Sequence, residues 1–348
     1  MVRVDGYVHH TGDHCGSTSL RNLAGRYDWG VDEPTCFGLA AGLGFTYFEL
    51  ARAPHRGFFG RPLWIEDAFF EHLGIGYERW QPGIAAEPDT DDERWAAVVD
   101  RLRDRTAAGD PVMVFTDIFH LEYFDTGTHF APHTILVVDV DGDEVVLSDS
   151  EFDAVQRVPI PDLRAAMGSD AVFDLGYRHL VVTDPEPTVD LATAARAAIE
   201  TTADAMLDPN RRDRPLGRGS HGLDGIRAFA DDLPAWTDLP DPQWTARFAY
   251  QNVERRGTGG GAFRSLYARF LHRMIAELPE LDPALAERTA AIADDWTSIG
   301  ETLKTASELD RATDSEFPEL LADASDAIRG VADREERLAR DLLEAVSN

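Results

Sequence analysis

The chain has 348 residues, which is long enough for two domains that each bury a hydrophobic core. It contains 63 Asp and Glu residues against 33 Lys and Arg residues, so its net charge is −30, and Lys304 is the single lysine. No basic segment could neutralise phosphates, which excludes nucleic acid as a partner. The acidic residues are spread along the whole chain, a composition typical of proteins that work in concentrated salt, where ions screen their mutual repulsion. We therefore expect a halophilic protein.

The apolar segments are short. None approaches the roughly 20 residues that a membrane-spanning helix needs, and no signal peptide precedes Cys15. We therefore expect a soluble, cytoplasmic protein that does not bind a membrane. Cys15 and Cys36 are the only cysteines, and we expect both to be reduced thiols, with Cys36 acting as a small buried apolar residue.

The first predicted element is a helix that begins at Cys15, after the polar turn at residues 12–13. A thiol at this position faces the unpaired backbone N–H groups and the positive end of the helix dipole. Both features stabilise a thiolate, which is the nucleophilic form of cysteine. Cys15 is therefore the first candidate for a catalytic residue.

Apolar and β-branched runs predict strands at residues 111–115, 134–140, 144–148 and 176–182. A three-residue loop at 141–143 would join the second and third of them, so that opposite residues have numbers that sum to 284. Asp149 would then face Ile135. His133 and Ile135 share a face of their strand, so His133 and Asp149 would be diagonal neighbours, whereas a two-residue loop would break this register.

The pattern changes near residues 184–189. Beyond that segment apolar residues recur at helical spacing, as at 191–198, 263–274 and 320–328. We therefore expect two domains, at residues 1–184 and 185–348. The expected fold class is α+β, with a papain-like N-terminal domain in which a helix packs on an antiparallel sheet, followed by an all-helical domain.

Two sets of motifs resemble a known family. The N-terminal set resembles the N-terminal domain of butirosin biosynthesis protein H and comprises His14-Cys15-Gly16-Ser17, Glu33-Pro34 and the segment Phe37 to Phe45. The C-terminal set resembles the helical domain of unknown function that accompanies it and comprises the segment Arg255 to Arg264, Tyr267 and Phe270-Leu271. Together the two resemblances cover nearly the whole chain, which looks like a halophilic archaeal member of the family.

The resemblance implies a cysteine-peptidase-like fold that is used for acyl transfer in secondary metabolism, without a cofactor. Cys15 would accept an acyl group from a thioester, which an acyl carrier protein could present, and pass it to a small amine. His133 would act as base and later as acid, and Asp149 would orient the imidazole. The tetrahedral oxyanion would be bound by the backbone N–H of Cys15, with a side chain of either His9 or His10 as a second donor.

Five further residues are candidates for substrate binding. Asp117 and Tyr123 follow a predicted strand, where pockets commonly form, and could contact the amine, or they could form hydrogen bonds within a loop. Arg255, Arg256 and Arg264 flank a glycine run at the start of a helix, and such a site can hold an anion such as the phosphate of a carrier's pantetheine arm. The alternative for this glycine run is a plain connection between two helices.

A metal site is a second chemical possibility. Histidines and a thiol, ligands that suit zinc, form two sequence clusters, one at His9, His10, His14 and Cys15 and the other at His120, His129 and His133. Pro132 prevents His129 and His133 from lying one turn apart on a regular helix, and neither set of spacings matches a closed four-ligand site. We therefore expect no metal.

Three questions stay open at the level of the sequence. The acyl enzyme could react with water instead of an amine, which would make the protein an amidase, thioesterase or peptidase-like hydrolase. A binding protein that keeps the fold without catalysis is another alternative; it would leave Cys15 with an ordinary thiol pKa. Spare apolar faces on the helical domain are compatible with a homodimer.

Overall fold

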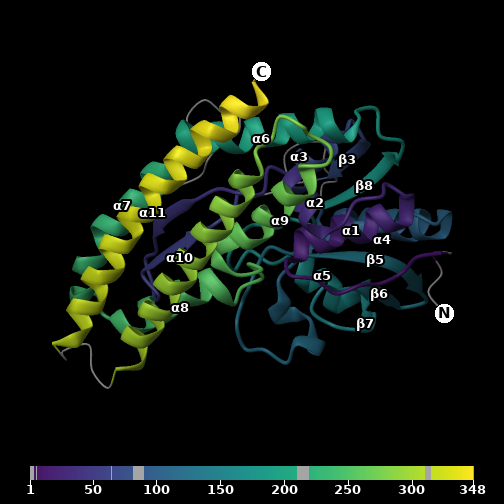
Figure 1. The fold of residues 1–348 in the computed structure, drawn as a ribbon. Helices are drawn as coiled ribbons and strands as arrows, with labels where there is room; N and C mark the ends of the chain where they lie inside the picture. The colour runs from purple at the N-terminus through teal and green to yellow at the C-terminus, as the bar shows by residue number, and fades with distance from the viewer. Residues whose placement is uncertain are drawn as a thin grey trace. The chain divides into compact units, whose positions relative to one another are not determined.

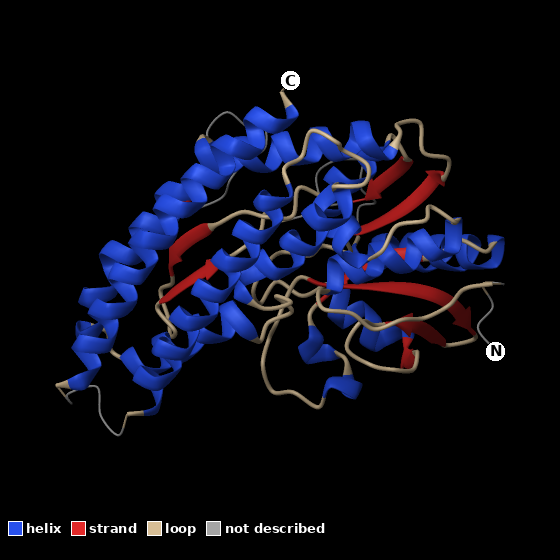
Figure 2. Ribbon diagram, in the orientation of Figure 1, coloured by secondary structure: helices blue, strands red, loops and turns tan. Residues whose placement is uncertain are grey.

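A computed structural model of the protein describes residues 4, 6–63, 65–80, 90–209, 219–309 and 315–347. The chain divides into two compact units: unit 1 comprises Met1–Cys36 and Gly74–Thr188, and unit 2 comprises Phe37–Leu73 and Val189–Asn348. A single division after residue 184 does not describe this arrangement, because residues 37–73 leave the N-terminal part and join the C-terminal part. The expected α+β class is confirmed (Figures 1 and 2).

Unit 1 consists of an antiparallel sheet and its helices. The helices are α1 (Cys15–Tyr27), α4 (Asp91–Ala108) and α5 (Ile160–Met167), with the short 3₁₀ turns η1 (Ile118–His120) and η2 (Glu122–Phe124). The strands are β3 (Gly76–Trp80), β4 (Val112–Thr116), β5 (His133–Asp141), β6 (Glu144–Ser148), β7 (Gln156–Pro159) and β8 (His179–Asp184). Within the described residues of this unit, the strands form one six-stranded sheet in the order β3-β8-β4-β5-β6-β7.

Both faces of the sheet are buried near its centre. Val114, Ile135 and Val137 point to one face, where they belong to a core cluster with side chains of α4 and α5. Leu136 and Val138 alternate with them, point to the opposite face and are also buried. Helix α1 contacts β5, and both elements lie together in Figure 1. This packing explains why β5 is a continuous apolar run in the sequence instead of an alternating one.

The hairpin of β5 and β6 has the expected pairing at its open end, but its turn is shorter than expected. The turn has only two residues, Gly142 and Asp143, and Gly142 adopts a positive φ of 63°. Pairs next to the turn, such as Val140 with Val145, therefore have numbers that sum to 285. An irregularity between residues 137 and 139 then shifts the register by one, so that Leu136 pairs with Ser148. A two-residue loop and a bulge together give the pairing that a three-residue loop would give.

Unit 2 is mainly helical. Its helices are α3 (Ile65–Leu73), α6 (Leu191–Leu207), α7 (Gly222–Asp232), α8 (Pro242–Glu254), α9 (Arg264–Met274), α10 (Pro283–Glu308) and α11 (Glu316–Val346), with 3₁₀ turns η4 (Leu233–Asp238) and η5 (Gly261–Phe263). Helix α2 (Glu33–Leu39) contains the boundary between the units. A small sheet pairs β1 (Thr46–Glu49) with β2 (Arg56–Phe59) and with β9 (Ser220–His221), so the unit is not entirely helical.

Aromatic packing explains why residues 37–73 belong to unit 2. The ring of Phe45 stacks on Trp296 of α10, with ring centroids 5.5 Å apart, and on Phe229 of α7 at 6.2 Å. Gly38 lies against the ring of Phe270 so closely that a Cβ atom there would collide with it. These contacts bury large apolar surface, the main source of stability in such a core.

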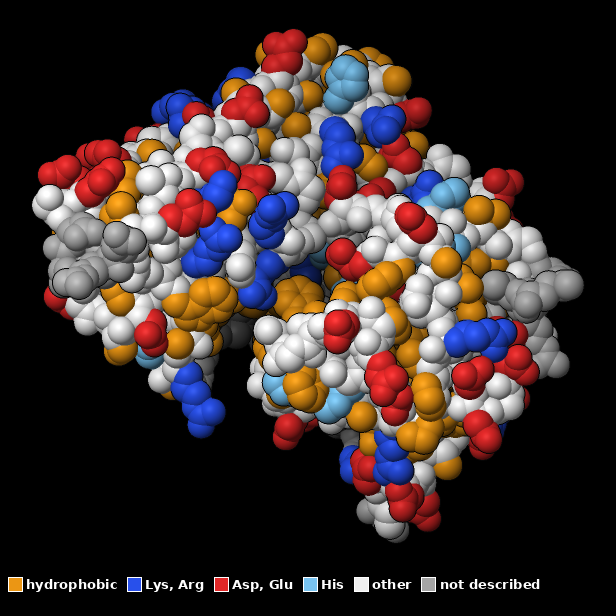
Figure 3. Space-filling model, turned by 90° about the horizontal axis from the view of Figure 1, so that it is seen from below, with side chains coloured by type: hydrophobic (Ala, Val, Ile, Leu, Met, Phe, Trp, Pro, Cys, Tyr) orange, Lys and Arg blue, Asp and Glu red, His pale blue; other side chains and the backbone are white. Residues whose placement is uncertain are grey.

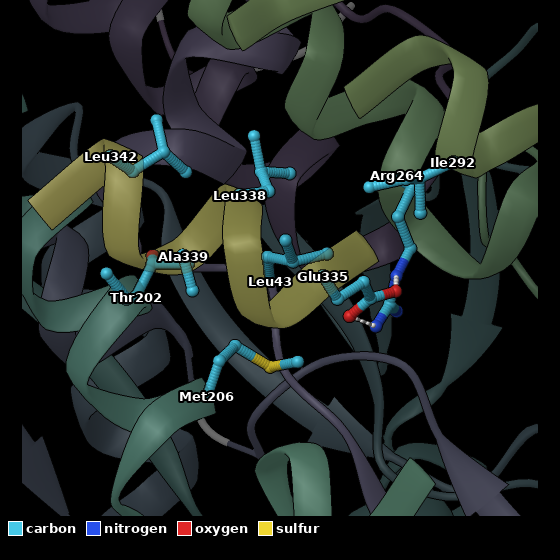
Figure 4. A pocket seen from close by; sticks show the side chains of 10 residues that line it. Leu43, Thr202, Met206, Arg264, Ile292, Glu335, Leu338, Ala339 and Leu342 are labelled. Atoms are coloured by element: carbon cyan, nitrogen blue, oxygen red, sulfur yellow. Dashed lines mark hydrogen bonds and ion pairs between the residues drawn. The ribbon is translucent and has the colours of Figure 1, made fainter. Parts of the chain in front are cut away.

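The cavity of unit 2 drawn in Figure 4 has a volume of about 10 Å³. Thr202, Leu338 and Leu342 are among the side chains around it, and a volume of that size holds at most one water molecule. At one end Arg264 forms a bidentate ion pair with Glu335. The cavity is therefore a packing defect and not a ligand pocket.

Acidic side chains are spread over the face seen in Figure 3 and do not gather in one patch. This distribution agrees with the scattered acidic residues of the sequence. Among the helices of the described segments, none combines the length and the apolar character that crossing a membrane requires.

Candidate active site

Cys15 is the first residue of α1, and its side chain is buried. His14 caps the helix: it has extended backbone angles, and its Nδ1 atom accepts a hydrogen bond from the backbone N–H of Ser17 at 3.2 Å. No acceptor among the described residues binds the backbone N–H groups of Cys15 and Gly16. Those two donors are therefore available to an anion beside the thiol.

Glu33 holds the start of α1 in place. Its carboxylate accepts hydrogen bonds from the backbone N–H groups of Asp13 and His14 and from the hydroxyl groups of Ser17 and Thr18, at 2.9–3.1 Å. In the sequence Glu33 stands out only as part of a family motif, and its role at the start of α1 becomes visible only in the structure. A carboxylate 18 residues beyond Cys15 is not a recognisable capping signal, because local capping boxes span only three residues.

His133 and Asp149 are in direct contact. Nε2 of His133, the first residue of β5, lies 2.9 Å from Oδ2 of Asp149, which directly follows β6. Both side chains are buried, with exposed fractions of 3% and 0%. With Nε2 bonded to the carboxylate, Nδ1 is the ring atom left for the thiol, and Cys15 and His133 lie close enough to shift each other's pKa. The structure thus brings the three predicted residues together within unit 1.

The charges at this site favour an ion pair between thiol and imidazole. Burial alone would raise the pKa of Cys15, but His14 and His133 outweigh it and hold this pKa well below the ordinary thiol value. Burial alone would lower the pKa of His133, yet Asp149 and Cys15 raise it well above its usual value. The directions of these two pKa shifts favour a thiolate–imidazolium pair over a neutral thiol and imidazole.

Asp149 has further partners that keep it ionised and fixed. The hydroxyl of Tyr123 donates a hydrogen bond to Oδ2 at 2.8 Å, and the backbone N–H of Glu151 donates one to Oδ1 at 3.1 Å. Burial would raise the pKa of Asp149, but His133 and these two donors lower it. Burial and the adjacent Asp149 charge in turn raise the pKa of Tyr123 far above its usual value. Tyr123, expected at a pocket, therefore supports the carboxylate.

An aromatic ring contacts the imidazole, and a second ring packs on the first. The ring of Phe124 meets His133 edge to face, with centroids 5.3 Å apart, and Phe152 packs on both Phe124 and Tyr123 at 5.1 and 5.0 Å. An apolar shell of this kind limits access of water and strengthens the electrostatic interactions inside it.

The two histidines expected near the oxyanion occupy other positions. Nδ1 of His9 lies 2.7 Å from Oγ of Ser148 and its Nε2 lies 2.7 Å from the carbonyl oxygen of Phe152. Because the hydroxyl of Tyr7 already donates to the same Oγ atom, Ser148 donates to Nδ1 and the Nε2–H donates to Phe152. His9 therefore ties the N-terminal segment to the loop that carries Asp149. The side chain of His10 is exposed.

Asp117 fixes a loop. Its fully buried carboxylate accepts hydrogen bonds from the backbone N–H groups of Phe119 and Phe130 on Oδ1, and from Ser169 and His129 on Oδ2. These partners lie on both sides of the segment that leads into β5. This arrangement corresponds to the loop role that the sequence analysis gave as the alternative to substrate contact.

The three arginines flanking the glycine run belong to unit 2. Arg264 is fully buried, and it donates to both carboxylate oxygens of Glu335 and to the carbonyl oxygens of Gly60 and Ala262. Arg256 donates to the side chain of Gln251, and Arg255 is exposed. The donors of Arg264 are thus engaged within the unit.

Two family models match the chain. One, described as butirosin biosynthesis protein H, N-terminal, matches residues 14–150, a segment that begins one residue before Cys15 and ends one residue after Asp149. The other, described as a domain of unknown function (DUF4872), matches residues 161–342. No curated protein matches the chain.

Proposed function

Because the chain belongs to the family that joins a butirosin biosynthesis protein H N-terminal domain to the domain of unknown function DUF4872, we propose that it is a biosynthetic, cysteine-dependent acyltransferase. The observation that carries the proposal is the buried group of Cys15, His133 and Asp149, in which Nε2 of His133 lies 2.9 Å from Oδ2 of Asp149 and the thiol and the imidazole shift each other's pKa. This arrangement, with a buried carboxylate behind the imidazole, is what nucleophilic cysteine catalysis requires.

In the first half-reaction the Cys15 thiolate attacks the carbonyl carbon of an acyl thioester. The carbonyl oxygen becomes an oxyanion, for which the backbone N–H groups of Cys15 and Gly16 are suitable donors. When the intermediate collapses, the C–S bond to the donor breaks and the His133 imidazolium gives its proton to the departing thiolate. The products are a free thiol and an acyl group on Sγ of Cys15.

In the second half-reaction an amine attacks the acyl group on Cys15. His133, now neutral, removes the proton that the amine loses, and the C–S bond to Cys15 breaks. The result is an amide, and the thiolate–imidazolium pair is restored. Asp149 stabilises the imidazolium in both half-reactions and is not itself protonated.

The donor class follows from the nucleophile. A thiolate and a thioester exchange readily because both leaving groups are thiols, so an acyl thioester, carried by a small thiol or by a carrier protein, is the proposed donor. The ring of Phe124 on His133, with the ring of Phe152 packed on Phe124, favours transfer to an amine over hydrolysis, since these apolar rings limit water near the acyl group.

Intact-protein mass spectrometry tests this proposal. The protein is incubated with acyl thioesters of N-acetylcysteamine that differ in chain length and polarity, and the mass gain is mapped by peptide analysis. We expect one acyl group on Cys15, no acylation of Cys15→Ala, and at least a hundredfold slower acylation of His133→Ala. Discharge by added amines, with the amide as product, supports a transferase. Discharge to the free acid at the same rate with and without amines would instead establish a hydrolase, and an unmodified Cys15 across the panel would overturn the proposal.

A further inference from the structure

A second group of polar side chains lies in unit 1, separate from the trio around Cys15. It comprises Asp117 directly after β4, His120 at the end of η1, and His129 in the loop before β5. One ligand atom from each residue lies within 4.8 Å of the others. His133, which the sequence placed near His120 and His129, is bonded to Asp149 instead and does not belong to this group.

Asp117 has the features of a carboxylate ligand held in advance. It is fully buried, and its oxygens accept hydrogen bonds from two backbone N–H groups and from Ser169 at 2.8 Å. Burial alone would raise the pKa of Asp117, but these donors and His129 lower it, so the group is a carboxylate at neutral pH. Metal-binding carboxylates are typically oriented by such outer hydrogen bonds.

The two imidazoles are on the solvent side of this carboxylate. Nδ1 of His129 lies 2.6 Å from Oδ2 of Asp117, and the His129 side chain is 40% exposed. Its ring stacks on Phe119 with centroids 4.1 Å apart, and the rings of His120 and His129 are 6.0 Å apart. The aromatic contacts restrict both rings, while the exposure of His129 leaves a path for an ion and room for a water ligand.

We propose that Asp117, His120 and His129 form a binding site for a divalent transition-metal ion of the zinc type. Two imidazoles and one carboxylate are a common three-ligand set for zinc, and imidazole ligands disfavour magnesium and calcium. Ligand atoms of one tetrahedral zinc ion lie about 3.4 Å apart. The distance between any two of the three ligand atoms therefore has to change by at most about 1.5 Å to bind the ion. A water molecule would fill the fourth position.

The ion would join η1 to the segment that leads into β5, whose first residue is His133. In the metal-free protein the hydrogen bond between Asp117 and His129 makes the same connection more weakly. Metal binding displaces the proton that those two groups share.

Isothermal titration calorimetry of the full chain with zinc chloride tests this inference. The parent protein carries Cys15→Ser, which removes the competing thiolate, and is freed of metal with EDTA followed by gel filtration. We expect one equivalent of zinc, an increase in the thermal unfolding midpoint, and a visible absorption band of tetrahedral cobalt when cobalt(II) replaces zinc. His120→Ala and His129→Ala should each weaken binding at least tenfold, and Asp117 is left intact because its loss would release the loop.

His10→Ala is the matched control, because His10 is an exposed histidine of the same unit that lies outside the group. It should bind zinc as the parent does. If the parent binds less than one equivalent, or if either His120→Ala or His129→Ala binds zinc as tightly as the parent, the proposed site is wrong. Because the parent lacks the Cys15 thiol, neither result depends on acyl transfer.

Discussion

His14 and His133 lower the pKa of the Cys15 thiol, and Asp149 and Cys15 raise the pKa of His133, so the thiol and the imidazole of His133 favour each other's charged forms. The depressed pKa of Cys15 favours the thiolate at neutral pH, and this form disappears only as the pH falls through that lowered value. The raised pKa of His133 has the opposite sign: the imidazolium is present at low and neutral pH and is lost as the pH rises through the raised value.

Alkylation of Cys15 by iodoacetamide measures this coupling. In the wild-type protein the rate should remain high at pH values well below 8.5, the ordinary thiol pKa, because only the thiolate reacts. In His133→Ala the onset of labelling should move to higher pH, since the neighbouring positive charge is gone. Cys36 is a built-in control: it is fully buried, and burial together with Asp32 and Glu33 raises its pKa, so it should stay unlabelled. Identical pH profiles in the two proteins would contradict the ion pair.

Tyr123→Phe probes the hydrogen bond on the other side of Asp149. The substitution keeps the ring contact with Phe152 and removes only the donor to Oδ2. Because a hydrogen bond to a buried charge contributes about 1.5–3 kcal/mol, we expect a loss of that size in the free energy of unfolding by urea. Tyr27→Phe is the control, because its hydroxyl donates to the partly exposed Asp110 and should contribute less. Equal losses in both variants would show that the hydrogen bond to Asp149 stabilises the protein no more than the one to Asp110.

Among the elements, the start of α1 depends on close packing around Glu33. A Cβ atom at Gly12 would lie 2.2 Å from Oγ1 of Thr18 and 2.5 Å from Oε2 of Glu33. Gly12→Ala should therefore push the carboxylate away from α1 and destabilise the protein by about 1–3 kcal/mol, with slower alkylation of Cys15. Gly25→Ala, inside the same helix with open space around it, should be neutral or stabilising by up to about 1 kcal/mol. Thermal unfolding of both variants checks this, and a neutral Gly12→Ala would contradict the packing.

In unit 2, two adjacent glutamates of α11 differ in burial. Glu335 pairs with Arg264, and both side chains are almost completely buried, while Glu336 pairs with Arg227 and Arg340 at the surface. Glu335→Gln leaves a buried guanidinium without its counter-charge, so we expect a loss of about 3–5 kcal/mol in the free energy of unfolding. Glu336→Gln should change it by no more than about 1 kcal/mol. Urea titrations of the two variants give the comparison, and losses of equal size would refute it.

The whole molecule carries a net charge of −30, and acidic side chains are spread over the face seen in Figure 3. Repulsion among these charges opposes the compact state at low ionic strength, and salt screens it, since the Debye length falls from about 10 Å at 0.1 M to about 3 Å at 1 M. We therefore expect the thermal unfolding midpoint to rise steadily between 0.1 and 2 M potassium chloride. Sucrose at equal osmolarity is the control for exclusion effects. A midpoint that salt does not raise more than sucrose does would contradict a halophilic adaptation.

Much of the candidate site follows from short-range patterns. The turn before Cys15 and the apolar run after it define the start of a helix, and strand periodicity puts His133 and Asp149 on the same side of a hairpin. These inferences hold because they depend on neighbouring residues alone. The details of the hairpin differ, because the bulge near Val138 and the two-residue turn compensate each other and leave no separate mark in the sequence.

The sequence by itself determined the α+β class, the helix that carries Cys15, the hairpin that carries His133 and Asp149, and the acidic surface. Only the tertiary structure decided that residues 37–73 pack into unit 2, that Glu33 holds the start of α1, and that Asp117 accepts a hydrogen bond from His129. The physical reason is the distance along the chain over which each kind of interaction acts. Periodicity and helix capping act within a few residues of the chain, whereas aromatic packing and buried carboxylates select partners by their position in space.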